Sequence, residues 1–213
     1  MKKYFTLMIS LVLIFTITVP AFADATTASE IKFDISPFEN SDNYTIEFDD
    51  MDDTCKISFT EDEHVVGVFD NDNGAVWGNV DVKIVENLPP VLRTALLYTG
   101  EDWIFIDRVI IKTSNSRYTF EVERDTDVSD GKIWEFFTLV FTDESIQMLQ
   151  DIVDSNDFYV KCRLDGSSRD VDGRLYFNLD QIKELLDDYQ ASGALDNDFS
   201  IIKELCPCKV KQS

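Results

Sequence analysis

Alternating apolar and polar positions dominate the chain from residue 31 onward, and a period of two is typical of half-buried β-strands. Tyr44, Ile46 and Phe48 alternate with polar residues, and the same pattern repeats after an acidic turn. Residues 103–112 are almost continuously apolar, so we expect a central strand that is covered on both faces. Strands are predicted at 44–48, 55–59, 64–69, 76–85, 103–112, 117–124, 132–141, 158–164 and 174–177.

Helical periodicity appears only in the second half of the chain. Residues 146–153 carry one apolar stripe, and Thr142 stands before them as the predicted N-cap. Asn178 and Gln181 form the pattern of a capping box at the start of the next helix. Helices are therefore predicted at 142–153, 179–189 and 199–205.

Many antiparallel strands followed by a few helices predict an α+β fold, with a mainly antiparallel sheet and two or three helices in the C-terminal half. The same patterns divide the chain into four segments. We expect a signal peptide at 1–23, a flexible lead-in at 24–30, a single α+β domain at 31–192, and a C-terminal helix and tail at 193–213.

Residues 1–23 have the three parts of a secretory signal. Lys2 begins a basic start, residues 4–19 are apolar, and Pro20-Ala21-Phe22-Ala23 places small residues where a signal peptidase cuts. We expect cleavage after Ala23 and a secreted, extracellular protein. An uncleaved anchor is the alternative, because about 20 apolar residues can just span a bilayer. No Cys follows the cut, which argues against a lipid anchor.

The charge of the chain is strongly acidic, with 41 acidic residues against 19 basic ones and a formal net charge of −22 at pH 7. Such a chain repels nucleic acid, anionic membrane surfaces and wall polyanions, so we exclude all three as electrostatic partners. Because 44% of the residues are hydrophobic and 12% are aromatic, we expect a folded chain with a sizeable core. An extracellular protein or a glycan remains as the partner.

Four cysteines follow the signal segment. Cys55 and Cys162 alternate with apolar residues, so each is expected to pack as a small buried hydrophobe. Cys206 and Cys208 flank Pro207, and a bond between these two would close a strained ring. Disulfides are possible in a secreted chain, and the pairing stays open. A four-cysteine zinc site is disfavoured because the tail would have to reach two core strands.

The motifs for hydrolysis or metal binding are incomplete. His64 is the single histidine, no Gly-x-Ser-x-Gly elbow accompanies it, and zinc hydrolases use two or three histidines. Cys55 is expected to be too buried to act as a nucleophile beside His64. The acidic segments Asp70-x-Asp72-x-Gly74 and Asp170-x-Asp172-Gly173 lack the spacing of an EF-hand, so hairpin turns are favoured over an irregular calcium site.

Glu135 and the tryptophans are the remaining candidates. Glu135 lies within an apolar strand, and a buried carboxylic acid could serve a hydrolase. We favour a position at a sheet edge open to water, or pairing with an arginine such as Arg163. Trp77, Trp103 and Trp134 could form a sugar-binding platform. Core packing is favoured for Trp103 and Trp134, and exposure for Trp77.

Several short motifs resemble a domain found in secreted proteins and lipoproteins of Gram-positive bacteria. They are Leu97-Tyr98-Thr99-Gly100-Glu101-Asp102-Trp103-Ile104-Phe105-Ile106, Arg117-Tyr118, the strand around Glu135, and Arg163-Leu164-Asp165-Gly166. The resemblance covers about residues 97–189 and implies secretion and an α+β fold. It implies no activity and no catalytic residue. This chain lacks the Cys that carries the lipid in the lipoprotein members.

The sequence therefore predicts a secreted, non-catalytic binding or interaction module whose ligand is unknown. The alternatives are a carboxylate-dependent extracellular hydrolase and a calcium-stabilised accessory protein. No cofactor is expected, no residue is assigned a catalytic, cofactor-binding or metal-binding role, and no membrane contact is expected after signal cleavage.

Overall fold

The computed structural model describes residues 31–60, 65–69, 74–129, 131–156 and 158–212. Residues 31–213 belong to one compact unit. It is mostly antiparallel sheet, with 51% strand and 21% helix, and the sheet curls into a half-barrel with four small helices among the described residues. The α+β prediction is therefore wrong, because the chain is richer in strand and one helix precedes the sheet.

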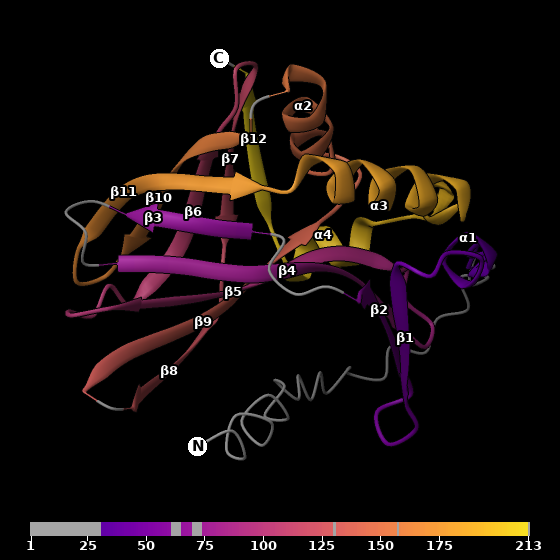
Figure 1. Cartoon of the computed structure of the whole chain (residues 1–213), viewed down its shortest axis with the longest axis horizontal. Coiled ribbons are helices and arrows are strands. Elements are labelled where there is room, and N and C mark those ends of the chain that lie inside the picture. The colour runs from indigo at the N-terminus through magenta and orange to yellow at the C-terminus, as the bar shows by residue number, and fades with distance from the viewer. Residues whose placement is uncertain (1–30, 61–64, 70–73, 130, 157, 213) are drawn as a thin grey trace. The chain divides into compact units, whose positions relative to one another are not determined.

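Twelve strands form the sheet in the described part of the chain. They are β1 (Tyr44–Asp49), β2 (Thr54–Phe59), β3 (Val65–Phe69), β4 (Gly74–Val85), β5 (Val91–Gly100), β6 (Ile106–Lys112), β7 (Ser116–Glu121), β8 (Arg124–Ser129), β9 (Lys132–Phe141), β10 (Tyr159–Gly166), β11 (Asp170–Phe177) and β12 (Cys208–Gln212). Their order is β12-β7-β6-β10-β11-β3-β4-β5-β9-β8, and β1 and β2 extend the sheet beside β4 (Figure 1).

The middle of the sheet is a pairing between segments far apart in the sequence. Val65 on β3 lies opposite Phe177 on β11, and the other strand pairs on either side of this seam are antiparallel as well. β4 is long enough to pair with β3 through its first half and with β2 through its second half. The seam therefore joins the group β12-β7-β6-β10-β11 to the group β3-β4-β5-β9-β8.

The curl encloses the hydrophobic core on the inner face of the sheet. Phe120 on β7 contacts Phe141 on β9 edge to face, with ring centroids 5.7 Å apart, although many strands separate them in the sheet order. Along β9 the inner residues from Ile133 to Phe141 are buried at every second position, and those between them are half-buried or exposed. The outer face of the sheet consequently faces solvent.

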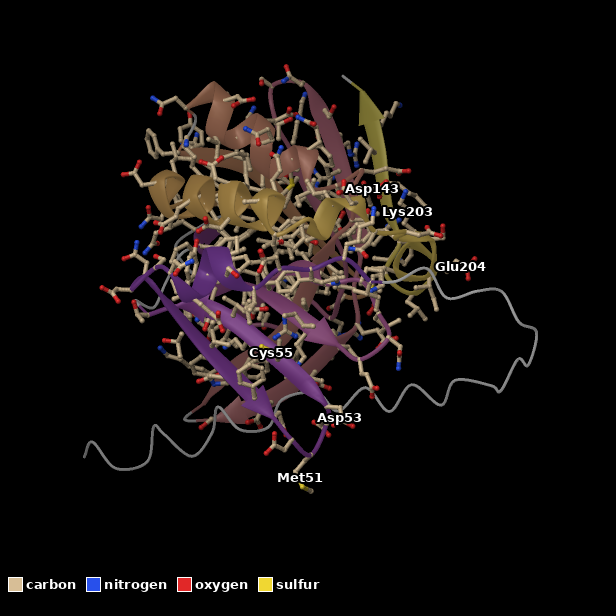
Figure 2. The ribbon with its side chains drawn as sticks, turned by 90° about the vertical axis from the view of Figure 1, so that its right-hand side faces the viewer. Met51, Asp53, Cys55, Asp143, Lys203 and Glu204 are labelled. Atoms are coloured by element: carbon tan, nitrogen blue, oxygen red, sulfur yellow. The ribbon has the colours of Figure 1, made fainter. Side chains whose placement is uncertain are left out.

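Four helices accompany the sheet: α1 (Ser36–Glu39), α2 (Gln147–Ser155), α3 (Leu179–Ala191) and α4 (Ser200–Leu205). α2 and α3 contact each other and bury apolar side chains in the same core as the strands. The Tyr189 hydroxyl on α3 donates a hydrogen bond of 2.7 Å to the Pro90 carbonyl before β5. Lys203 on α4 pairs with Asp143 at 2.9 Å (Figure 2). It also pairs with Glu144 at 3.0 Å. None of the described helices has the length and apolarity of a membrane span.

The segment between the predicted strands at 117–124 and 132–141, which we took for a loop, and the predicted C-terminal tail both contain strands. β8 and β12 lie at the two ends of the sheet order. A strand at the edge of a sheet has a neighbour on one side only, and it commonly carries charged residues that discourage pairing on the other side. The alternation of apolar and polar residues along such a strand is therefore weak. The prediction of a continuous strand at 103–112 also differs from the structure. Phe105 has a φ of 55°, and β6 begins only at Ile106.

The helix caps show one agreement and one difference. Asn178 caps α3 as predicted, since its side chain accepts a hydrogen bond of 3.4 Å from the Gln181 N–H. Thr142 does not cap α2. Its own N–H donates to the Ser145 hydroxyl at 2.8 Å in a preceding turn, and the helix begins at Gln147. The short helix α1, which includes Pro37, was not predicted.

Tyr98 occupies space on the inner face that two glycines leave free. A Cβ atom at Gly100 would lie 2.1 Å from the Tyr98 hydroxyl oxygen, and one at Gly74 would lie 2.8 Å from the ring. An Arg169 guanidinium nitrogen lies 3.4 Å from the same hydroxyl. Because Tyr98 is 1% exposed, its ring has no room to move aside. Glycine is therefore required at both positions by close approach.

We expect Gly100→Ala to lower the free energy of unfolding by about 1–3 kcal/mol, because the new methyl group and the hydroxyl cannot share one space. Tyr98→Phe removes the nearest atom, so the same substitution should lower stability less in a Tyr98→Phe background. Chemical unfolding of the four chains measures this difference. An equal loss in both backgrounds would show that the contact is not the cause.

Candidate functional site

The Glu135 carboxylate is a structural anchor on the inner face of β9. The side chain is 0% exposed. One carboxylate oxygen accepts N–H hydrogen bonds from Ile104 at 2.7 Å and Phe105 at 3.0 Å, and the other accepts from Ile106 at 2.8 Å. These bonds hold the segment before β6, where Phe105 has positive φ. Glu135 is thus neither at a water-exposed edge nor paired with Arg163, which binds Asp172 at 2.6 Å.

This burial removes Glu135 from any role that requires contact with a substrate. A general acid must reach the group that it protonates, and three backbone donors already surround this carboxylate. Trp103 stacks on Phe105 with ring centroids 5.2 Å apart and is half-buried beside the anchored segment. The residues around Glu135 are therefore arranged for packing.

We expect Glu135→Gln to lower the free energy of unfolding by about 2–4 kcal/mol, because an amide NH₂ would face backbone N–H groups and leave donors unpaired. Glu204→Gln is the matched control, since Glu204 is exposed on α4 (Figure 2) and should change stability by less than about 0.5 kcal/mol. Urea unfolding followed by circular dichroism measures both. A Glu135→Gln variant as stable as the control would contradict the anchoring role.

The candidate metal and nucleophile residues do not come together in the described structure. His64, Asp70 and Asp72 lie outside the described residues. Asp170 and Asp172 belong to β11 rather than to a turn, and Asp172 is engaged by Arg163. The described residues contain no group of three or more His, Cys, Asp or Glu side chains that could hold a metal ion.

The four cysteines are free thiols. Cys55 and Cys162 are buried as predicted, and burial raises the pKa of both thiols. Burial also raises the pKa of Cys206 and raises the pKa of Cys208 to about 12. A thiol with a raised pKa is mostly protonated at neutral pH and is a weak nucleophile. The structure therefore places no activated cysteine at a surface site.

We expect all four thiols of the reduced protein to react slowly with a disulfide reagent at pH 7, at rates at least about tenfold below those in denaturant. Burial and the raised pKa values both suppress the thiolate. Colorimetric counting in 6–8 M urea should find all four groups. One rapidly reacting thiol in the folded protein would contradict the prediction.

The outer face of the sheet brings large apolar side chains into one cross-strand row. Residues directly opposite one another on antiparallel strands share a face. The register pairs Tyr159 with Tyr176, continues through β3 to Trp77, and then reaches Leu97 and Phe136. We call these five residues the aromatic row. It crosses β10, β11, β3, β4, β5 and β9 in order (Figure 1).

Ring contacts organise the aromatic row into two clusters. Trp77 meets Trp134, which lies one register position away on β9, edge to face with centroids 6.0 Å apart. At the other end, Tyr159 and Tyr176 lie 6.0 Å apart, and Phe158 contacts both. Within the row, Phe136 is 39% exposed and Tyr159 37%, and Phe158 beside the row is 58% exposed. The row therefore offers aromatic surface to solvent on a rigid scaffold.

Trp134 illustrates what the sequence interpretation missed. We predicted that it would pack in the core, but it lies half-buried on the outer face beside Trp77. β9 is apolar on both faces, so alternation alone could not assign its inner face. The buried Glu135 next to it marks the inner face instead. Trp77, which was expected to be exposed, is half-buried within the same cluster.

An open hollow of about 490 Å³ lies beside the anchored segment, lined by Phe105, Val122, Glu123, Arg124 and Thr126. Its one cation is committed to internal contacts. The Arg124 guanidinium pairs with Asp107 at 2.5 Å, donates to the Ile106 carbonyl and lies 5.3 Å from the centre of the Phe105 ring. The aromatic row is the stronger candidate because its side chains remain available.

Comparison with protein-family models, with curated proteins and with solved structures gives no match for this chain.

Proposed function

We propose that the protein is an exported, non-catalytic binding module, and that its aromatic row together with Trp134 binds a glycan. The exposed aromatic surface on a sheet face carries this proposal. Aromatic rings offer flat apolar area with few rotatable bonds, and the C–H faces of sugar rings are complementary to such area. The outer face of an antiparallel sheet is ordinarily polar, so two aromatic clusters in one cross-strand row on it indicate a binding surface.

The dimensions of the row favour an extended ligand. Neighbouring strands lie about 4.8 Å apart, so a path from β10 to β9 spans roughly 24 Å across the strands. The row is a surface on one face of the sheet, and its members come from separate strands held by backbone pairing. A linear oligosaccharide lying across the strands would meet Tyr159, Tyr176, Trp77 and Phe136 in turn.

The surroundings of the row support binding rather than turnover. Glu135, the carboxylate that we considered for hydrolysis, points into the core and is held by three backbone N–H groups. On the outer face Asp81 is 1% exposed and bound by Arg93. Asp125 and Asp127 lie on the edge strand β8, opposite Phe136 and Trp134. Glycoside hydrolysis needs two carboxyl groups on opposite sides of one bond, and a flat row does not enclose a bond in that way.

We expect Trp77→Ala and Trp134→Ala each to weaken binding of the recognised glycan by at least about tenfold, since each removes a large part of the stacking surface. Phe48→Ala is the matched control, because Phe48 is 70% exposed on β1 and lies outside the row. Thermal shift against wall glycans, plant glycans and peptides identifies the ligand class, and titration calorimetry then measures each variant.

Three results would overturn this proposal. Binding of peptides alone would exclude a glycan ligand, and equal weakening by Phe48→Ala would exclude the row as its site. Cleavage of the bound glycan by the unmodified protein would exclude a purely non-catalytic role.

A further inference from the structure

Five exposed basic side chains form an uninterrupted row across five neighbouring strands. The register places Lys211 opposite Arg117, Arg117 opposite Lys112, Lys112 opposite Lys161, and Lys161 opposite Arg174. Their strands are β12, β7, β6, β10 and β11, which are consecutive in the sheet (Figure 1). All five residues are exposed. We call them the basic row.

No carboxylate in the described part of the chain forms an ion pair with any member of the basic row. Acidic residues of the same strands are engaged elsewhere: Asp172 by Arg163, Asp165 by Arg108, and Glu121 by Lys209. The Arg174 guanidinium lies 4.7 Å from the centre of the Tyr159 ring, which leaves its charge unneutralised. The five cations are thus available to an external anion.

Without a bound ligand, the basic row lowers the stability of the sheet. Like charges directly opposite one another on neighbouring strands are destabilising. The chain has 41 acidic residues against 19 basic ones, so an acidic side chain between these cations would be the expected arrangement for stability alone. A repulsive row that a bound anion would relieve indicates a ligand site.

The basic row continues directly into the proposed glycan surface. Arg174 lies opposite Val68 on β3, and the same register row proceeds through Ala75 and Thr99 to Trp134. On the same face of their strands, Lys161 is also the next residue after Tyr159, and Arg174 is the one before Tyr176. A single linear ligand crossing the strands would therefore meet cations over β12 to β11 and aromatic rings over β10 to β9.

We propose that this face binds an acidic polysaccharide, with the basic row holding its anionic groups; this inference rests on the proposed glycan-binding function. The row spans roughly 19 Å at the usual strand spacing of about 4.8 Å, enough for several sugar units. The net charge of −22, from which we excluded polyanions as electrostatic partners, does not prevent this contact. Repulsion from distant carboxylates is screened beyond a Debye length of about 8 Å at physiological ionic strength, whereas direct contacts in the row are screened much less.

The experiment compares dextran sulfate with uncharged dextran, two polymers with the same backbone, against the full-length protein in calorimetric titrations. We expect binding of dextran sulfate that weakens as salt is added, and markedly weaker binding of dextran. Lys112→Gln, Lys161→Gln and Arg174→Gln combined should raise Kd by about tenfold to a hundredfold, since each exposed cation contributes a few-fold to affinity. The salt dependence of binding should fall with it.

The matched control substitutes glutamine for three lysines outside the row. They are Lys32, Lys56 on β2, and Lys183 on α3. It changes the net charge by the same amount, so its Kd should stay within about twofold of the unmodified protein. Equal weakening by the control would show that overall charge, rather than the row, governs binding. Absence of dextran sulfate binding at low salt would also overturn the inference.

The thermal stability of the row variant distinguishes a ligand-binding role of the cations from a structural role. Without polymer at low salt, the row variant should have a thermal midpoint equal to the unmodified protein or higher by a few degrees, because like-charge repulsion is removed. A lower midpoint would overturn the inference by showing that the cations support the fold. Tighter binding of polyglutamate, single-stranded DNA or anionic vesicles than of dextran sulfate would overturn it in favour of another polyanion.

The two proposals can fail separately. If a neutral glycan binds and depends on Trp77 while dextran sulfate does not bind, the acidic specificity is wrong and the glycan module stands. If dextran sulfate binding depends on the basic row but is unchanged by Trp77→Ala and Trp134→Ala, the aromatic row is not the glycan surface.

Discussion

The three hydrogen bonds to the Glu135 carboxylate are the constraint on which the shape of the sheet depends. They join β9, in one group of strands, to the segment that enters β6, in the other group. A flat sheet of this order would hold these two strands far apart. Because the carboxylate draws Ile104 and Ile106 toward β9, the sheet closes around Phe137, Tyr98 and the rest of the core. The opposite face, which carries the aromatic row and the basic row, is then turned to solvent.

This division of faces explains how an acidic chain can carry two unlike surfaces. Inside the curl, polar groups are few, and the charged group of Glu135 is fully hydrogen-bonded. Outside it, the aromatic row and the basic row occupy neighbouring register positions, and the two groups of strands contribute unequally to them. The cations lie on the strands from β12 to β11, whereas the tryptophan cluster lies on β4 and β9. The net charge of the chain does not predict this segregation of charged and aromatic residues.

The parts of this architecture that depend on local rules could be predicted from the sequence. Alternation located most strands, the Asn178 cap located the start of α3, and Cys55 and Cys162 were placed correctly in the core. Three of the described strands were missed: β8 and β12 are polar edge strands, where alternation is weak because one side of the strand is unpaired. The central strand β5 was missed although every second residue from Leu92 to Gly100 is buried. Glu135 was placed in its strand, but its donors come from a segment some 30 residues earlier. Both surface rows depend on which strands are neighbours in the sheet, and the sequence of a single strand does not determine its neighbours.

The seam between β3 and β11 determines when this protein can fold. Val65 must find Phe177, so more than half of the chain separates the partners that unite the two groups of strands. Contacts of such long sequence separation form slowly, because the loop must close before any pairing is gained. In the group β3-β4-β5-β9-β8, the pairs β3-β4, β4-β5 and β8-β9 are local hairpins, and β9 returns to pair with β5. The β3 edge of this group nevertheless stays open until β11 arrives. During synthesis a chain of this topology remains without its central strand pairing until most of its length has emerged from the ribosome, which would favour the export of an unfolded chain that we propose.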